Sequence, residues 1–120
     1  MSNSKHNILI AKFMGMKPHH QDASYMVRRG ADSRFAGLND IVRVSALDYD
    51  TSWDWLMGVV EQIEATLDSD GYGHNVEISN TLCVIRSGND GEEVINGQEG
   101  LTKIDAVYSA VVEFIKTEKA

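Results

Sequence analysis

Residues 52–69 read SWDWLMGVVEQIEATLDS. Apolar side chains recur in this stretch at intervals of three and four residues, the spacing of one face of an α-helix. Thr51, with Asp54 three residues later, is typical of a capping box, and turn residues follow at 68–73. We therefore predict a helix over 52–69. Its apolar face comprises Trp53, Leu56, Met57, Val60, Ile63 and Leu67.

A second amphipathic helix is predicted over residues 103–118. Thr102 and Asp105 repeat the capping pattern, and Lys116 and Lys119 complement the negative end of the helix dipole. The apolar stripe of this helix comprises Ile104, Val107, Tyr108, Val111, Phe114 and Ile115.

Residues 75–86, between these helices, indicate two strands joined by a tight turn. Val76 and Ile78 alternate with polar residues, and an apolar run follows at 82–85. Asn80 suits the turn because asparagine tolerates a positive φ. Residues 87–101 contain four glycines and several acids, so we expect a solvated loop there, with Val94 and Ile95 as a candidate short edge strand.

The first part of the chain is less regular. Residues 8–14 predict a short helix, capped by Asn7 and closed by Gly15, with a strand at 7–11 as the alternative. Residues 17–47 have no clear period, and only 40–47 indicate a strand. A long unpatterned segment in a small domain is typical of a functional or mobile loop.

Composition bounds the class of protein. The chain has 120 residues and carries 18 Asp and Glu against 11 Lys and Arg, a net charge of −7. This acidic balance disfavours nucleic-acid binding, and no apolar run is long enough to cross a membrane. The opening residues lack a signal-peptide pattern, and the single Cys83 fits a reducing compartment, so we expect a cytoplasmic protein.

Together these elements predict the α+β class. We expect helices packed against a small, mainly antiparallel sheet, in an α/β/α-like layered sandwich. At this length, residues 1–120 are expected to form a single domain, with 17–47 as an irregular, insert-like segment.

Two stretches resemble a known family. Residues 49–64 read YDTSWDWLMGVVEQIE, residues 102–116 read TKIDAVYSAVVEFIK, and a pair of short strands is predicted between them. This pattern is similar to the phage ABA sandwich domains found in small phage and prophage proteins, and it covers roughly residues 7–15 and 49–116. The resemblance implies an α/β layered fold and activity inside an infected or lysogenic bacterial cell. It implies no catalytic residues, and 17–47 is expanded relative to the family's pattern.

Positive charge is concentrated in the insert-like segment. Residues 17–47 carry five Lys and Arg against three Asp, while the rest of the chain has a net charge of −9. Arginine offers forked donors for phosphate or carboxylate, and aromatic rings stack on bases. This pattern predicts a local anion site, the alternative being that the arginines pair with neighbouring acids. The candidate ligand-binding residues are Arg28, Arg29, Arg34, Arg43, Tyr25 and Phe35.

Other candidate sites are weaker. Asp68 and Asp70 resemble the start of a calcium loop, but Ser79 stands where a bidentate carboxylate is needed, so a helix-ending turn is favoured. Adjacent histidines diverge in an extended chain, which favours a solvated loop over a metal site at His19 and His20.

Cys83 and the two tryptophans also have competing interpretations. For Cys83, packing in a strand is favoured over a cysteine–histidine nucleophile with His74. We expect Trp53 to pack in the core, whereas Trp55 lies on a flank and is a candidate interface residue.

These observations favour a non-enzymatic phage accessory protein that binds, and in the sharpest version sequesters, an anionic nucleotide-type molecule of host defence signalling. We expect a small homo-oligomer with no cofactor and no bound metal. The first alternative is a protein-interaction or structural module whose acidic surface acts on a host or phage protein. An enzyme ranks third, because no nucleophile–base pair can be placed.

Overall fold

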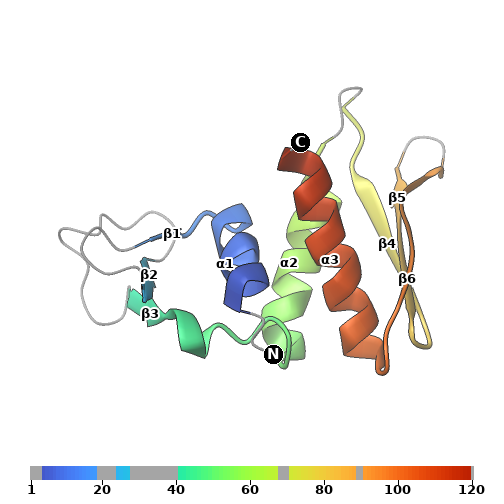
Figure 1. The fold of residues 1–120 in the computed structure, drawn as a ribbon. Helices are drawn as coiled ribbons and strands as arrows, with labels where there is room; N and C mark the ends of the chain where they lie inside the picture. Colours follow the sequence, from blue (N-terminus) through green and yellow to red (C-terminus); the bar gives the residue numbers. More distant parts are fainter. Residues whose placement is uncertain (1–3, 19–23, 28–40, 68–70, 89–90, 120) are drawn as a thin grey trace. The chain divides into compact units, whose positions relative to one another are not determined.

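The computed structural model describes residues 4–18, 24–27, 41–67, 71–88 and 91–119. The chain divides into two units, residues 1–48 and residues 49–120, and each is described by itself (Figure 1).

The first unit contains a helix and a small sheet. In chain order its elements are α1 (Ser4–Phe13), β1 (Lys17–Pro18), β2 (Tyr25–Val27), β3 (Ile41–Arg43) and the 3₁₀ helix η2 (Val44–Ala46). The three strands are antiparallel and follow the order β1-β2-β3. The strand predicted over 40–47 is therefore shorter than expected, because the chain turns into η2 after Arg43.

Helix α1 begins before its predicted start. Asn7 lies inside the helix, where its buried Nδ2 donates a hydrogen bond to the Leu47 carbonyl at 3.0 Å. The prediction that Asn7 caps the helix is wrong, as is the alternative of a strand at 7–11. Gly15 adopts φ 92°, the left-handed conformation expected of the residue that closes the helix.

The second unit packs two helices against a sheet. Its elements are α2 (Trp53–Ala65), β4 (His74–Ser79), β5 (Leu82–Ser87), β6 (Glu93–Glu99) and α3 (Lys103–Lys119). The sheet is antiparallel with β5 in the centre; α3 contacts all three strands, whereas α2 contacts β4 and α3 (Figure 1). Helices on small antiparallel sheets confirm the predicted α+β class.

Helix α2 differs from its prediction at both ends. The N-cap is Ser52, whose Oγ accepts a hydrogen bond from the Trp55 backbone N–H at 3.5 Å, so the assignment of the cap to Thr51 is wrong. The helix ends at Ala65 with Thr66 as its C-cap, earlier than predicted. Leu67 consequently lies outside the helix and is 63% exposed, so it is not a core residue.

The buried face of α2 is rotated relative to the predicted face. It comprises Leu56, Val59, Val60 and Ile63, and each valine lies three or four residues from both Leu56 and Ile63. Trp53 and Met57 lie beside this face rather than on it, and they are 39% and 38% exposed. The prediction that Trp53 packs in the core is wrong. Periodicity alone does not show which residue lies at the edge of the buried face, Val59 or Trp53.

The hairpin and the last helix agree with the sequence more closely. Asn80 takes φ 55° in the turn between β4 and β5, as predicted. The Asp105 backbone N–H donates to Thr102 Oγ1 at 3.3 Å, which confirms the predicted cap of α3. Strand β6 contains Val94 and Ile95, which confirms the candidate edge strand, but its seven residues make it longer than expected within the loop predicted over 87–101.

No helix in the described part of the chain is long and apolar enough to cross a membrane.

Candidate functional site

The candidate site in the first unit is centred on Tyr25 and Arg43. These residues occupy facing positions on β2 and β3, and the Arg43 Cζ atom lies 5.8 Å from the centre of the Tyr25 ring. This distance is within the range of a cation–π contact. Arg43 is exposed and Tyr25 is half-buried, so the pair presents both a guanidinium group and part of an aromatic ring at the surface.

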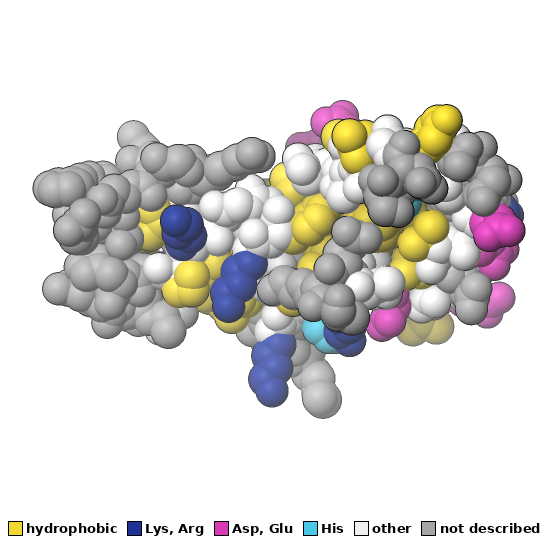
Figure 2. All heavy atoms as spheres, turned by 90° about the horizontal axis from the view of Figure 1, so that it is seen from above, with side chains coloured by type: hydrophobic (Ala, Val, Ile, Leu, Met, Phe, Trp, Pro, Cys, Tyr) yellow, Lys and Arg dark blue, Asp and Glu magenta, His cyan; other side chains and the backbone are white. Residues whose placement is uncertain are grey.

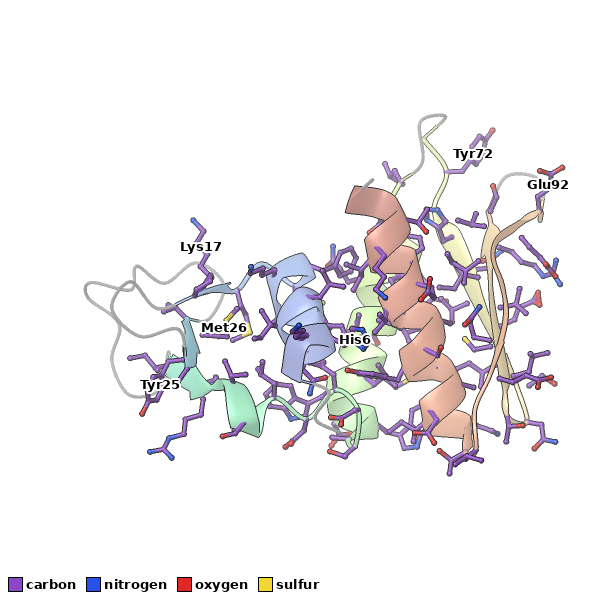
Figure 3. The ribbon with its side chains drawn as sticks, viewed as in Figure 1. His6, Lys17, Tyr25, Met26, Tyr72 and Glu92 are labelled. Carbon is purple, nitrogen blue, oxygen red and sulfur yellow. The ribbon has the colours of Figure 1, made fainter. Side chains whose placement is uncertain are left out.

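Successive side chains of β2 point to opposite faces of the sheet, so the Tyr25–Arg43 pair and the packed residues of this unit lie on different faces. Met26 follows Tyr25 in β2 and therefore points to the opposite face of the sheet. Figure 3 shows Met26 on the side of α1 and Tyr25 on the other side. Met26 is 1% exposed, so one face of β2 is used for packing and the other carries the candidate site.

Arg43 differs from Arg86 in its partners. On the outer surface of the second unit, the Arg86 Nε donates to Glu77 Oε2 at 3.0 Å and its Nη2 lies 3.6 Å from Glu93 Oε1. These carboxylates raise the pKa of Arg86. Within the described ranges, no carboxylate forms an ion pair with Arg43. For Arg43, the described acids therefore do not supply the ion pair that the alternative interpretation of the arginines in residues 17–47 requires.

Four of the six predicted site residues, Arg28, Arg29, Arg34 and Phe35, lie outside the described residues. The chain that carries them leaves β2 after Val27 and enters β3 at Ile41, and these two residues face each other in the sheet. The structure therefore brings together Tyr25 and Arg43 of the predicted set.

The second unit holds Cys83 in its core. Its side chain is 0% exposed, and burial raises the pKa of its thiol to about 11. Cys83 faces Ile78 across the hairpin, whereas His74 begins β4 four residues earlier, about 13 Å away along a strand. This geometry supports the packing interpretation of Cys83, because a nucleophilic cysteine needs an accessible thiolate and a base within hydrogen-bond reach.

The ring of His74 makes contacts that hold secondary-structure elements together. Its Nδ1–H donates to the Thr66 carbonyl at 2.7 Å, and its ring meets the Phe114 ring edge-on with centroids 5.0 Å apart. The side chain is 6% exposed. His74 therefore links β4 to the end of α2 and to α3.

The candidate metal sites lie largely outside the described residues. His19, His20, Asp68 and Asp70 are not among the described residues, and Ser79 is the last residue of β4. Within the described ranges, no three His, Cys, Asp or Glu side chains gather closely enough to hold a metal ion.

Trp55 has a partner that the sequence did not reveal. Its ring meets the Tyr49 ring edge-on, with centroids 5.2 Å apart, and Tyr49 is 5% exposed. Tyr108 of α3 is buried as well, and desolvation together with the charge of Asp50 raises its pKa. Trp55 thus forms an aromatic pair with the buried Tyr49, while the more exposed tryptophan is Trp53.

The division into units reveals a charge asymmetry larger than the one read from residues 17–47. Residues 1–48 contain seven Lys and Arg against four Asp, a net charge of +3. Residues 49–120 contain four Lys and Arg against fourteen Asp and Glu, a net charge of −10. In Figure 2, most blue side chains lie over the first unit, and the magenta side chains lie over the second. Counting charges by unit would have found this signal in the sequence.

Comparison of the chain with protein-family models finds no matching family. Neither a curated protein nor a solved structure matches it.

Proposed function

We propose that this chain is a non-enzymatic phage accessory protein that binds, and thereby sequesters, an anionic nucleotide-type small molecule of host defence signalling. The observation that carries the proposal is the Tyr25–Arg43 pair. The exposed guanidinium group offers several donors to a phosphate, and the adjacent ring offers a surface on which a base can stack.

The surrounding charge supports an anionic ligand. The unit that contains the pair has a net charge of +3 in a chain whose total is −7. In the proposal Arg28, Arg29 and Arg34 add phosphate donors, and Phe35 adds a second stacking ring. A phosphorylated molecule is attracted to this unit and repelled by the other, which directs it to residues 17–47.

The phage context of the proposal rests on the resemblance of residues 49–64 and 102–116 to the phage ABA sandwich domains. On that basis the protein acts in the cytoplasm of an infected or lysogenic bacterium, as a small homo-oligomer. Its binding without catalysis is consistent with the buried, protonated state of the Cys83 thiol.

The proposal is tested by purifying the protein from its bacterial host, heating it, and analysing the released small molecules by mass spectrometry. Two variants are prepared in the same way. Arg43→Ala removes the proposed phosphate donor, and Arg86→Ala is the matched control because it removes one positive charge outside the site. The proposal predicts one phosphorylated compound, in stoichiometric amount, from the wild type and from Arg86→Ala. Equal amounts from the Arg43→Ala protein would place the ligand elsewhere and overturn the assignment.

A further inference from the structure

The exposed side of α2 carries an apolar pair. Trp53 and Met57 are four residues apart, so their side chains are neighbours on the helix surface, about 5–6 Å apart at Cβ. More than a third of each side chain is exposed, although Trp and Met are residues that proteins usually bury. Exposed Trp and Met are also enriched at interfaces between proteins.

The same side of the helix continues with acids. Glu61 follows Met57 by four residues and Glu64 follows by seven, so both extend the exposed stripe toward the C-terminus of α2. A helix C-terminus carries partial negative charge and favours cations, yet the last turn of α2 contains no basic residue. The described residues form no ion pair with Glu61 or Glu64. These two charges therefore oppose the stability of the helix that carries them.

An apolar pair next to acids that form no ion pair with a described residue specifies the chemistry of a partner. We propose that the exposed stripe of α2, defined as Trp53, Met57, Glu61 and Glu64, docks a basic segment of another protein that inserts a large apolar side chain. The partner's Lys or Arg groups would neutralise both carboxylates, and its apolar group would cover the Trp–Met pair.

The charge of the whole unit favours a foreign basic partner over a second copy of this surface. Residues 49–120 carry a net charge of −10, so two such stripes repel each other, whereas a basic protein is attracted over long range. This inference does not depend on the anion site, because that site lies in residues 17–47 and the stripe lies in the other unit.

The experiment uses the full chain and two fluorescent helical peptides. The first is amphipathic, with Leu on one face and Lys on the other, and in the second Glu replaces every Lys. We expect the basic peptide to bind the wild type and the acidic peptide not to bind. Trp53→Ala, or Met57→Glu as a second variant, should weaken binding about tenfold or more, and Glu61→Gln with Glu64→Gln should have a similar effect. Circular dichroism checks that each variant folds.

The matched control is Glu92→Gln with Glu99→Gln, which removes the same charge from exposed positions outside the stripe. Binding by this control should stay within about twofold of the wild type. Equal weakening by the control, or unchanged binding by Trp53→Ala, would show general electrostatic attraction and overturn the proposal. A wild-type dimer in sedimentation analysis that becomes monomeric in Met57→Glu would assign the stripe to a second copy and also overturn it.

Discussion

The guanidinium group of Arg43 lies 5.8 Å from the centre of the Tyr25 ring, across a pair of facing positions on β2 and β3. Both side chains are held by the register of the sheet, and the opposite face of β2 is packed through Met26. The pair is thus fixed by its strands while Arg43 stays exposed. Changes to the arginines of this unit should affect ligand binding more than folding.

Replacing Arg28 and Arg29 together with Ala should abolish binding of the phosphorylated ligand. The proposal assigns both groups to phosphate contacts, and charge-assisted hydrogen bonds are the stronger class. The melting temperature should remain within about 3 °C of the wild type, because the proposal gives both side chains a role in ligand binding and none in folding. Binding by calorimetry and melting by differential scanning fluorimetry check the two parts. Retained binding would remove these two residues from the site.

Ser52→Ala should destabilise the protein by about 1 kcal/mol, because Ser52 is the N-cap of α2 and its Oγ accepts the Trp55 N–H. Thr51→Ala should change the free energy of unfolding by less than about 0.5 kcal/mol, since Thr51 is exposed and precedes the cap. Urea denaturation of both variants separates the two positions. A larger loss in Thr51→Ala would restore the cap assignment made from the sequence.

Gly58→Ala should stabilise the protein by up to about 1 kcal/mol. Gly58 lies in the middle of α2, where glycine costs conformational entropy relative to alanine. A Cβ at this position would meet nothing within 4 Å, so no packing cost offsets the gain. Gly73→Ala is the contrasting variant, since its Cβ would lie 2.5 Å from the Glu64 carbonyl oxygen. Thermal melts should therefore move in opposite directions.

The burial of Cys83 predicts a loss of stability in alkali. Its thiol has a pKa of about 11 in the folded protein, above the ordinary value of 9.0, so the thiol of the unfolded chain ionises first. The resulting stabilisation is complete below pH 9 and is lost as the pH rises toward 11. Denaturation curves across this range should show a steeper loss for the wild type than for Cys83→Ala. Parallel losses would mean that burial of the thiol makes no such contribution.

The fold could be predicted where local chemistry and packing agree. Most of the apolar stripe predicted for α3 is buried, and Thr102 caps that helix as predicted. Asn80 supplies the positive φ of the hairpin turn. The prediction failed where tertiary contacts decide. Strand β6 extends beyond the predicted Val94 and Ile95 over Gly97 and two glutamates because β5 offers an edge to pair with, which local propensity does not register.

The same distinction applies to the candidate site. The cluster of arginines was visible as a charge imbalance, but the pairing of Tyr25 with Arg43 depends on strand register, since eighteen positions separate them in the sequence. The exposure of Trp53 was not predictable from periodicity. The apolar stripe of the sequence is wider than the face that is buried, and periodicity does not show which residues at the edge of the stripe are exposed. Only the packing of α2 on β4 and α3 selects Leu56, Val59, Val60 and Ile63.

The most direct test of the anion site is a calorimetric titration of the wild type, Arg43→Ala and Arg86→Ala with a panel of linear and cyclic nucleotides. We expect at least one phosphorylated nucleotide to bind the wild type and Arg86→Ala with similar affinity, and Arg43→Ala to bind it about tenfold or more weakly. If no nucleotide binds the wild type, or if the two arginine variants lose affinity equally, the Tyr25–Arg43 pair is not a nucleotide site.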